Sequence, residues 1–188
     1  MTDPNAEEHV VLVDDRNAPI GTALKSSVHT DATPLHRGFS LFIFNGNGEL
    51  LLQQRSRNKV AFPLVWSNSC CGHPASGESP EDAARRRAKD ELGLAFTEVH
   101  MVLPDYRYRF ERDGIVENEF CPVMVAFTSD EPFPNSYEVG GTRWIPWRDF
   151  VTEISAFPKR YSPWCAEETL LLDGSTAFNA WMRNVAVA

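Results

Sequence analysis

Residues 72–94 read GHPASGESPEDAARRRAKDELGL, and the second half of this stretch carries signals for both ends of a helix. Ser79 is a residue type that caps helix N-termini, Pro80 suits the first helical position, and Gly93 suits the position after the last turn. Two acidic residues then complement the positive end of the helix dipole. The stretch therefore predicts a helix over about residues 80–92, preceded by a loop that contains glycine.

One face of this predicted helix carries small residues and a charge pair. Its members recur at spacings of three and four, which place side chains on the same side of a helix. They are Ala84, Arg87, Ala88 and Glu91. An ordinary salt bridge between residues four apart, beside a closely packed sheet, is the purely structural interpretation of this face. The helix alone does not separate that interpretation from a binding site.

Most of the other periodic segments predict strands. The clearest hairpin signal joins residues 39–44 to residues 50–54 through two Asn-Gly pairs. Further strands are predicted at 9–13, 97–103, 106–110, 120–127 and 143–145. A second, amphipathic helix is predicted from about residue 164 to 184, with a break allowed near Asp173-Gly174. Many strands with a few helices indicate a mixed α/β or α+β sandwich.

Length and charge limit the class of protein. A chain of 188 residues suits one domain, predicted here to span residues 1–188. Its 18 Lys+Arg against 26 Asp+Glu give a formal net charge of −8, which argues against general binding to nucleic acid or to an anionic membrane surface. No N-terminal stretch combines a basic start with an apolar segment, so we expect no export leader, and no apolar run is long enough to span a bilayer. Two of the four cysteines are adjacent, which is awkward geometry for a disulfide framework. We therefore expect a cytoplasmic protein with free thiols.

The loop and the helix together resemble the Nudix box. That signature is a glycine, five residues, a glutamate, seven residues and an ending of Arg-Glu-aliphatic-x-Glu-Glu-x-Gly-aliphatic. Residues 72–94 keep this spacing, but Arg87 and Asp90 stand where the ending has its first two glutamates, so that only Glu78 and Glu91 remain. Nudix hydrolases use these carboxylates to hold Mg²⁺ and to activate water against a diphosphate. The arginine therefore argues against hydrolysis and suits the binding of a diphosphate.

The wider sequence resembles the type I isopentenyl diphosphate isomerases over about residues 21–164. The matching segments are Lys25-x-x-x-His29 with His36, Arg55-x-x-x-Lys59, WSNSCCGHP at 66–74, DYRYR at 105–109, GIVENEFCP at 114–122 and YSPW at 161–164. The resemblance implies a Nudix-type α/β/α sandwich with its core over residues 21–164. It also implies an enzyme that interconverts isopentenyl diphosphate and dimethylallyl diphosphate, the precursors of isoprenoids.

Two carboxylates and three imidazoles are candidates for a metal site. Glu117 and Glu119 are two apart in an extended segment, so they face the same way, and a cation would relieve their repulsion. Considered without other evidence, the two glutamates would be interpreted as part of a solvated strand face. Each of His29, His36 and His73, considered singly, would be interpreted as a surface histidine or a hydrogen-bonded core histidine. The resemblance assigns all five to one site. Nitrogen and oxygen ligands without a thiolate suit Zn²⁺ or Mn²⁺.

The implied reaction adds a proton at one carbon and removes one from another, through a tertiary carbocation-like state. The acid and base of the family map to Cys71 and Glu119, and its assisting tyrosine maps to Tyr108. A cysteine is otherwise usually a small buried apolar residue, and we expect the adjacent Cys70 to point the opposite way and to pack. The aromatic wall that would face the cation maps to Trp164.

A diphosphate needs cations in spite of the negative net charge. The resemblance matches four of them to the substrate: Lys25, Arg55, Lys59 and Arg87. It also places a Mg²⁺ ion, held by Glu91, across the diphosphate oxygens. The expected partner is thus a small-molecule diphosphate, without nucleic acid or membrane, and the chain is expected to be a monomer.

Two other functions stay open at this point. A Nudix pyrophosphohydrolase would release phosphate and would tolerate the replacement Cys71→Ala. A non-catalytic module would bind metal and diphosphate but turn nothing over. The presence of Cys71 together with Glu119 argues against the module, because binding alone needs no thiol there.

Overall fold

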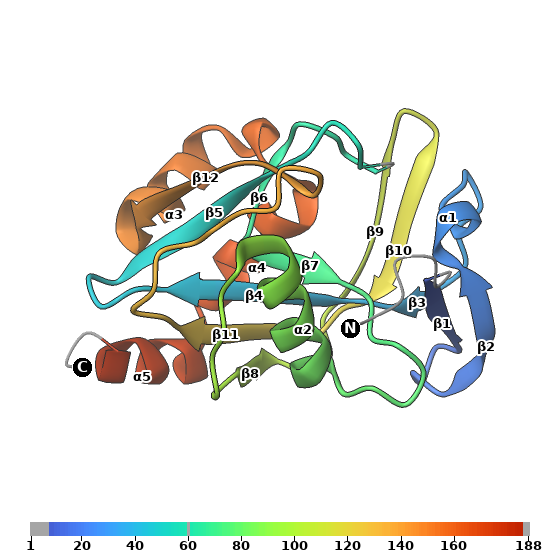
Figure 1. The fold of residues 1–188 in the computed structure, drawn as a ribbon, viewed down its shortest axis with the longest axis horizontal. Helices are drawn as coiled ribbons and strands as arrows, with labels where there is room; N and C mark the ends of the chain where they lie inside the picture. The colour runs from blue at the N-terminus through green and yellow to red at the C-terminus, as the bar shows by residue number, and fades with distance from the viewer. Residues whose placement is uncertain (1–7, 60, 186–188) are drawn as a thin grey trace.

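The strands form two sheets in the computed structural model, which describes residues 8–59 and 61–185. The larger sheet follows the path β12 (Val139–Pro146), β5 (Glu49–Arg55), β4 (Phe39–Phe44), β11 (Val123–Phe127) and β8 (His100–Leu103), with β6 (Trp66–Ser67) beside β5 and β7 (Cys70–Gly72) beside β4. The smaller sheet follows the path β2 (Pro19–Leu24), β1 (His9–Val13), β3 (His36–Arg37), β10 (Ile115–Phe120) and β9 (Arg107–Arg112). Figure 1 shows the β9–β10 hairpin between the larger sheet and the β1–β2 hairpin.

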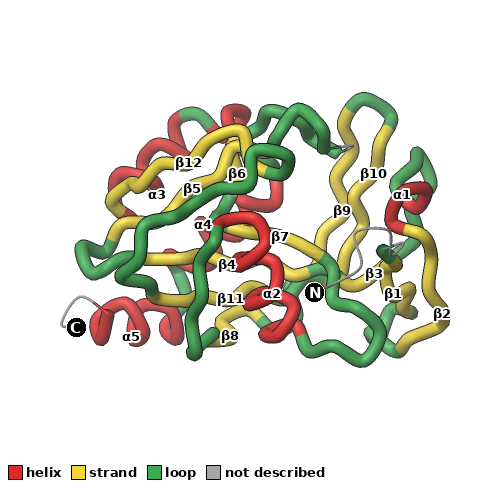
Figure 2. The backbone as a smooth tube through the Cα atoms, in the orientation of Figure 1, coloured by secondary structure: helices red, strands yellow, loops and turns green. Residues whose placement is uncertain are grey.

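Helices cover both faces of the larger sheet, as Figures 1 and 2 show. The helices are α1 (Lys25–Val28), α2 (Pro80–Leu92), α3 (Trp147–Ala156), α4 (Pro163–Asp173) and α5 (Thr176–Val185), with one turn of 3₁₀ helix at Pro158–Arg160. Helix α2 packs on one face, and α3, α4 and α5 pack on the other. None of the helices in the described part of the chain combines the length and apolarity that a membrane crossing requires.

Strand β4 lies at the centre because both of its faces are apolar. Phe39, Leu41 and Ile43 pack in the cluster that includes the alanines of α2. Phe42 and Phe44 pack in the cluster that includes aromatic residues of α3 and α5. A strand buried on both faces, with helices above and below it, is the arrangement expected of an α/β sandwich. The predicted fold class is therefore confirmed.

Helix α2 has the predicted bounds because its end signals are local. The Ser79 hydroxyl accepts a hydrogen bond from the backbone N–H of Asp82 at 3.1 Å. Gly93 takes the left-handed conformation with φ of 68°, which a residue without a side chain adopts at little cost. The small residues Ala84 and Ala88 are fully buried, so the backbone of α2 lies close to the sheet.

Some predicted bounds are wrong. The single strand predicted at 120–127 is two strands, β10 and β11, which belong to different sheets. The chain changes sheet at Cys121-Pro122, where proline has no N–H for a strand ladder. The helical C-terminal segment, by contrast, agrees with its prediction: it consists of two helices, α4 and α5, and the break between them falls at Gly174, where the sequence predicted that a break could occur. The one-domain prediction for residues 1–188 stays a prediction, and its first seven and last three residues lie outside the described ranges.

Candidate active site

A cavity of about 480 Å³ is lined by residues of both sheets and of helices α1, α2 and α4. Most of the site residues predicted from the sequence line it. They are Lys25, His29, Arg55, Lys59, Cys71, His73, Arg87, Tyr108, Glu117, Glu119 and Trp164. His36 and Glu91 do not line the cavity, and both are almost completely buried. The fold thus gathers predicted site residues that are up to 139 positions apart in the chain, Lys25 and Trp164, around one cavity.

Four possible metal ligands converge on one side of this cavity. Each of His29, His36, His73 and Glu119 has one ligand atom within 4.8 Å of those of the other three. His36 Nε2 lies 3.3 Å from His73 Nε2, and His73 Nε2 lies 3.1 Å from Glu119 Oε1. The register of β3 and β10 places His36 beside Glu119, and this pairing joins segments that are far apart in the chain.

The hydrogen bonds around this group of four fit a divalent cation. His36 Nδ1 lies 2.9 Å from the carbonyl oxygen of Pro34, which can only accept a hydrogen bond, so the proton sits on Nδ1. The Nε2 atom of a neutral His36 then presents a lone pair to His73. A carbonyl that holds the outer ring nitrogen is the usual support of a metal-bound histidine. Three nitrogens and a carboxylate suit Zn²⁺ or Mn²⁺.

Glu117 lies at the edge of the group. Its Oε2 atom is 3.4 Å from His29 Nε2, yet it makes no hydrogen bond with any residue that the structure describes. Glu117 and Glu119 are two apart on β10, so their side chains leave the strand on the same side. An orphaned buried carboxylate oxygen beside an imidazole is a further feature that a bound cation would explain.

Burial and mutual contact set the protonation of the group. Burial lowers the pKa of His73 to about 4. Burial also acts to lower the pKa of His36, but the contact with the Glu119 carboxylate outweighs it, and the pKa of His36 is raised. Burial acts to raise the pKa of Glu119, yet the imidazoles of His36 and His73 hold it well below its usual range. Glu119 is therefore an anion at neutral pH, as a metal ligand must be.

A prediction concerns Gly38, which contacts the Glu119 side chain. A Cβ atom added at Gly38 would lie 1.8 Å from Glu119 Oε2, so the carboxylate must move. Gly38→Ala should therefore weaken the binding of Mn²⁺ or Zn²⁺ by about 10-fold to 100-fold, measured by titration calorimetry. Gly46→Ala is the matched control, because its Cβ would meet only Phe127, at 4.0 Å. Equal affinities in the two variants would contradict the prediction.

Cys71 and Cys70 lie on opposite faces of β7, as the sequence predicted. The Cys71 thiol donates a hydrogen bond to Asn68 Oδ1 at 3.1 Å and lies 3.6 Å from Ser40 Oγ on the adjacent strand β4. Cys70 packs in the core below α2, and its sulfur lies 3.9 Å from Glu91 Oε2. Only Cys71 of this pair lines the cavity.

The proton-carrying groups of the cavity have shifted pKa values. Burial, with the charge of Glu168 as a second cause, raises the pKa of the Cys71 thiol to about 12. Burial and then the charge of Glu119 raise the pKa of Tyr108 well above its usual value. Tyr108 and Glu119 face each other in the β9–β10 ladder. Cys71 and Tyr108 are therefore protonated donors in the cavity at neutral pH, and Glu119 is a carboxylate acceptor in the same cavity.

Aromatic rings form another wall. The rings of Tyr108 and Trp164 are stacked, with centroids 5.6 Å apart and an angle of 15° between their planes. The Phe62 ring meets Trp164 edge-on at 5.0 Å. The guanidinium carbon of Arg55 lies 5.5 Å from the Trp164 ring centroid, and two nitrogens of Arg55 donate to the carbonyl oxygen of Ala61. This wall attracts positive charge.

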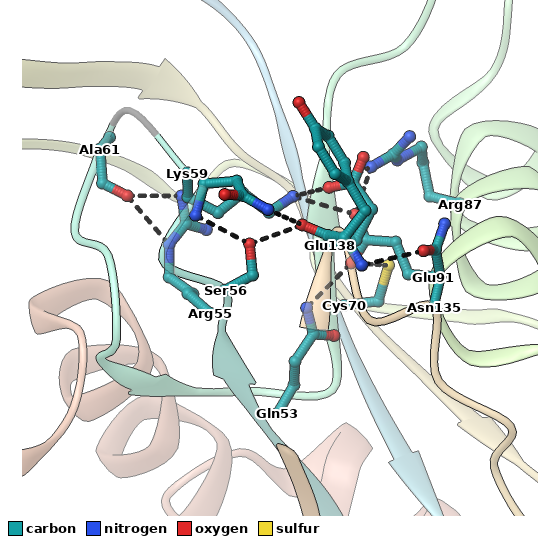
Figure 3. A network of polar contacts seen from close by, with 12 residues as sticks. Gln53, Arg55, Ser56, Lys59, Ala61, Cys70, Arg87, Glu91, Asn135 and Glu138 are labelled. Carbon is teal, nitrogen blue, oxygen red and sulfur yellow. Dashed lines mark hydrogen bonds and ion pairs between the residues drawn. The ribbon is translucent and has the colours of Figure 1, made fainter. Parts of the chain in front are cut away.

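Figure 3 shows the polar network at the basic end of the cavity. Glu91 Oε1 contacts both Lys59 and Arg87, and its Oε2 accepts a hydrogen bond from Gln53 at 2.9 Å. Because the Cys70 thiol also points to Oε2, both oxygens of Glu91 already have donors. Glu91 therefore lies on the interior side of Lys59 and Arg87, away from the cavity.

Two acidic residues of this end were not predicted. Glu8 pairs with Lys25 and Arg87, and Glu138 pairs with Lys59 and Arg87. Both glutamates line the cavity. They lie outside every motif of the sequence, and no spacing relates them to the cations that they contact, so no signal in the chain identified them.

Comparison with known proteins identifies relatives over most of the chain. The NUDIX domain family matches residues 34–165. The isopentenyl-diphosphate Delta-isomerase of Saccharopolyspora erythraea is 49% identical over 162 residues, which are 86% of this chain and 84% of that protein. The enzyme of the same name from Kocuria rhizophila is 46% identical over 89% of this chain and 94% of its own length. That from Clavibacter michiganensis subsp. michiganensis is 40% identical over 98% of this chain and 96% of its own.

Solved structures share the fold at lower identity. The protein DR0079 from Deinococcus radiodurans superposes with a TM-score of 0.62 at 24% identity, over 79% of this chain and 90% of that one. A MutT protein from Methanosarcina mazei Go1 superposes with a TM-score of 0.54 at 19% identity, over 63% of this chain and 82% of that one. These likenesses support the fold and carry no argument about substrate.

Proposed function

The chain belongs to the Nudix-domain isopentenyl-diphosphate Delta-isomerases, and on that premise we propose how its own residues perform the reaction. It is an enzyme that interconverts isopentenyl diphosphate and dimethylallyl diphosphate. One observation supports the assignment of roles most directly: Cys71, Glu119 and Tyr108 line the same cavity as the cations that suit a diphosphate.

We propose that Cys71 and Glu119 are the acid–base pair. The isomerisation adds a proton to the terminal methylene carbon and takes one from the carbon two positions away, so the substrate gains and loses one proton. One group of the pair gives the first proton and the other accepts the second. The pair ends with its protonation exchanged, and the net transfer of one proton from the group that gained it to the group that lost it must restore the pair before the next turnover. Tyr108, opposite Glu119 in the ladder, assists the transfer.

The aromatic wall has a role in the same step. Protonation of the alkene places positive charge on a tertiary carbon. The faces of Trp164 and Tyr108 would stabilise that charge by about 0.5 to 2 kcal/mol, more where water is excluded. Trp164 is 2% exposed, so its face offers a dry contact. A hydrolase has no such need of an apolar, cation-stabilising wall.

Metal ions complete the proposal. His29, His36, His73, Glu117 and Glu119 would hold a Mn²⁺ or Zn²⁺ ion, which supplies positive charge that orients Glu119 and tunes its pKa. Glu91 would hold the Mg²⁺ that accompanies the diphosphate. Glu91 Oε1 contacts Lys59 and Arg87, and it would be released when these two cations turn to the diphosphate oxygens.

The setting of the enzyme also stays a proposal. We propose that the chain acts as a monomer in the cytoplasm, with neither nucleic acid nor a membrane as a partner. The net charge of −8 supports the absence of nucleic-acid and membrane partners, because it repels polyanionic surfaces. The substrate class itself, a small diphosphate, follows from the family.

The test of the proposed function is incubation of the purified protein with isopentenyl diphosphate and Mg²⁺ in D₂O. We expect deuterated dimethylallyl diphosphate without release of phosphate, followed by mass spectrometry and a phosphate assay. Phosphate without the isomer would instead indicate a pyrophosphohydrolase. Neither product from a metal-loaded protein would indicate a binding module.

A further inference from the structure

Two carboxylates share the same two cations at the basic end of the cavity. Lys59 Nζ contacts Oε1 of Glu91 at 3.5 Å and also pairs with Oε2 of Glu138. Arg87 Nη2 pairs with Oε1 of Glu91 and lies 3.5 Å from Oε2 of Glu138. The four side chains form a closed set of alternating charges, shown in Figure 3 with Glu138 between Lys59 and Arg87.

The two carboxylates lie on different sides of the cations. The Glu91 side chain is 1% exposed, is held by Gln53, and does not line the cavity. The Glu138 side chain is 23% exposed and lines the cavity. Glu91 thus contacts Lys59 and Arg87 from the protein interior, and Glu138 contacts them from the side on which a diphosphate would enter.

The backbone of Glu138 is anchored, so its carboxylate stays near these cations. Its N–H donates to Asn135 O at 3.0 Å, and its carbonyl accepts from the N–H of Ser56 at 3.1 Å. The preceding carbonyl, of Tyr137, accepts from the Ser56 hydroxyl at 2.6 Å. The N–H of Asn135 in turn donates to the carbonyl of Glu91 at 2.8 Å, which ties this loop to the end of α2. A tethered anion competes with a free one at a high effective concentration.

Glu138 also carries its charge at neutral pH. Burial acts to raise its pKa, but the charge and hydrogen bond of Lys59 and the charges of Arg87 and Lys25 together outweigh burial and lower the pKa. A diphosphate that binds Lys59 and Arg87 must therefore displace the Glu138 carboxylate from them. The displaced carboxylate would then lie close to the negatively charged diphosphate and repel it. A divalent cation that arrives with the diphosphate weakens this repulsion, because its charge offsets part of the negative charge of the diphosphate.

We propose that Glu138 is an internal competing anion of the diphosphate site, which weakens the binding of free diphosphate and makes tight binding depend on the accompanying divalent cation. The proposal rests on the proposed function, since it takes Lys59 and Arg87 as diphosphate-binding residues. It makes Glu138 a residue that sets the specificity of the site for the metal complex of a diphosphate over the metal-free anion.

The test is calorimetric titration of inorganic diphosphate into wild-type protein and into Glu138→Gln. In magnesium-free buffer, the variant should bind at least about tenfold more tightly, because one competing unit charge is gone. With saturating Mg²⁺ the two proteins should differ by less than about threefold. The ratio of the two dissociation constants, without and with Mg²⁺, should therefore fall several-fold in the variant.

Glu131→Gln is the matched control. Glu131 lies in the same connection between β11 and β12, and its replacement changes the net charge equally, but its carboxylate contacts Trp144 outside the cavity. This control should bind metal-free diphosphate as the wild type does. If Glu138→Gln does not fold, the variant Glu138→Ala, which removes the same charge, is used in its place.

Unchanged or weaker binding of metal-free diphosphate by Glu138→Gln would overturn the proposal. If the wild-type protein of the same preparation converts isopentenyl diphosphate, this result leaves the proposed function intact. A wild-type protein that neither binds inorganic diphosphate nor converts the substrate would overturn both.

Discussion

Replacement of Cys71 with serine should lower kcat by about 10²-fold to 10⁴-fold and leave the melting temperature nearly unchanged. The reason is chemical, because a hydroxyl gives up a proton much less readily than a thiol. The fold should tolerate the change, since Cys71 lies at the cavity wall and a serine hydroxyl can also donate to Asn68 Oδ1. Dimethylallyl diphosphate formation and thermal unfolding, measured on the same sample, check the two parts of this expectation.

Cys70→Ser is the control for this prediction. Cys70 is buried in the cluster below α2 and has no contact with the cavity. A hydroxyl placed there costs about 1–3 kcal/mol of stability if it finds no partner, but it removes no proton donor from the site. We expect a lower melting temperature and nearly normal turnover. Equal losses of activity in the two variants would remove the case for Cys71 as a member of the acid–base pair.

Glu119→Gln should have an effect of similar size, through two separate losses. Glutamine keeps the shape of glutamate but has no negative charge, so it can neither accept the proton nor serve as an anionic ligand beside His36 and His73. We expect kcat to fall by about 10³-fold and the affinity for Mn²⁺ or Zn²⁺ to fall by about 10-fold to 100-fold. Steady-state kinetics and metal titration measure these effects independently.

Glu117→Gln separates the two losses. Glu117 lies beside His29 at the edge of the metal group, and the proposed chemistry gives it no proton to carry. Its replacement should also weaken metal binding, but a large excess of metal should restore most of the activity. Excess metal should not restore Glu119→Gln. Recovery of Glu119→Gln by metal alone would show that its carboxylate is only a ligand.

The sequence was sufficient where a structure depends on neighbours along the chain. The ends of α2 were predicted because Ser79 and Gly93 act on backbone groups within a few residues of themselves. The opposite orientation of Cys70 and Cys71 was predicted for the same reason, since alternation is a property of any strand. Strand β10 was misplaced because its partner on one side, β3, is a two-residue strand far away in the chain.

The candidate site was predicted in its members but not in its arrangement. Its residues came from a resemblance that spans many segments, because single histidines and single cysteines have simpler explanations. The resemblance did not indicate that both carboxylate oxygens of Glu91 would already have hydrogen-bond donors. Nor did it indicate that the Glu119 carboxylate would occupy the space where any residue other than glycine at position 38 would have its Cβ atom. Both facts depend on how α2 and β10 pack against other elements.

The sequence by itself determined the class of fold, the positions of α2 and β4, and the residue types available for proton transfer and for binding a diphosphate. Local hydrogen bonds and the alternation of apolar residues carry the information about the fold class and the elements, and the resemblance over many segments supplied the site residues. Only the tertiary structure decided that Glu8 and Glu138 lie against Lys25, Lys59 and Arg87 and that Cys71 and Glu119 line one cavity. These contacts join segments dozens of residues apart, and pairing between strands, which no short stretch of sequence encodes, brings them together.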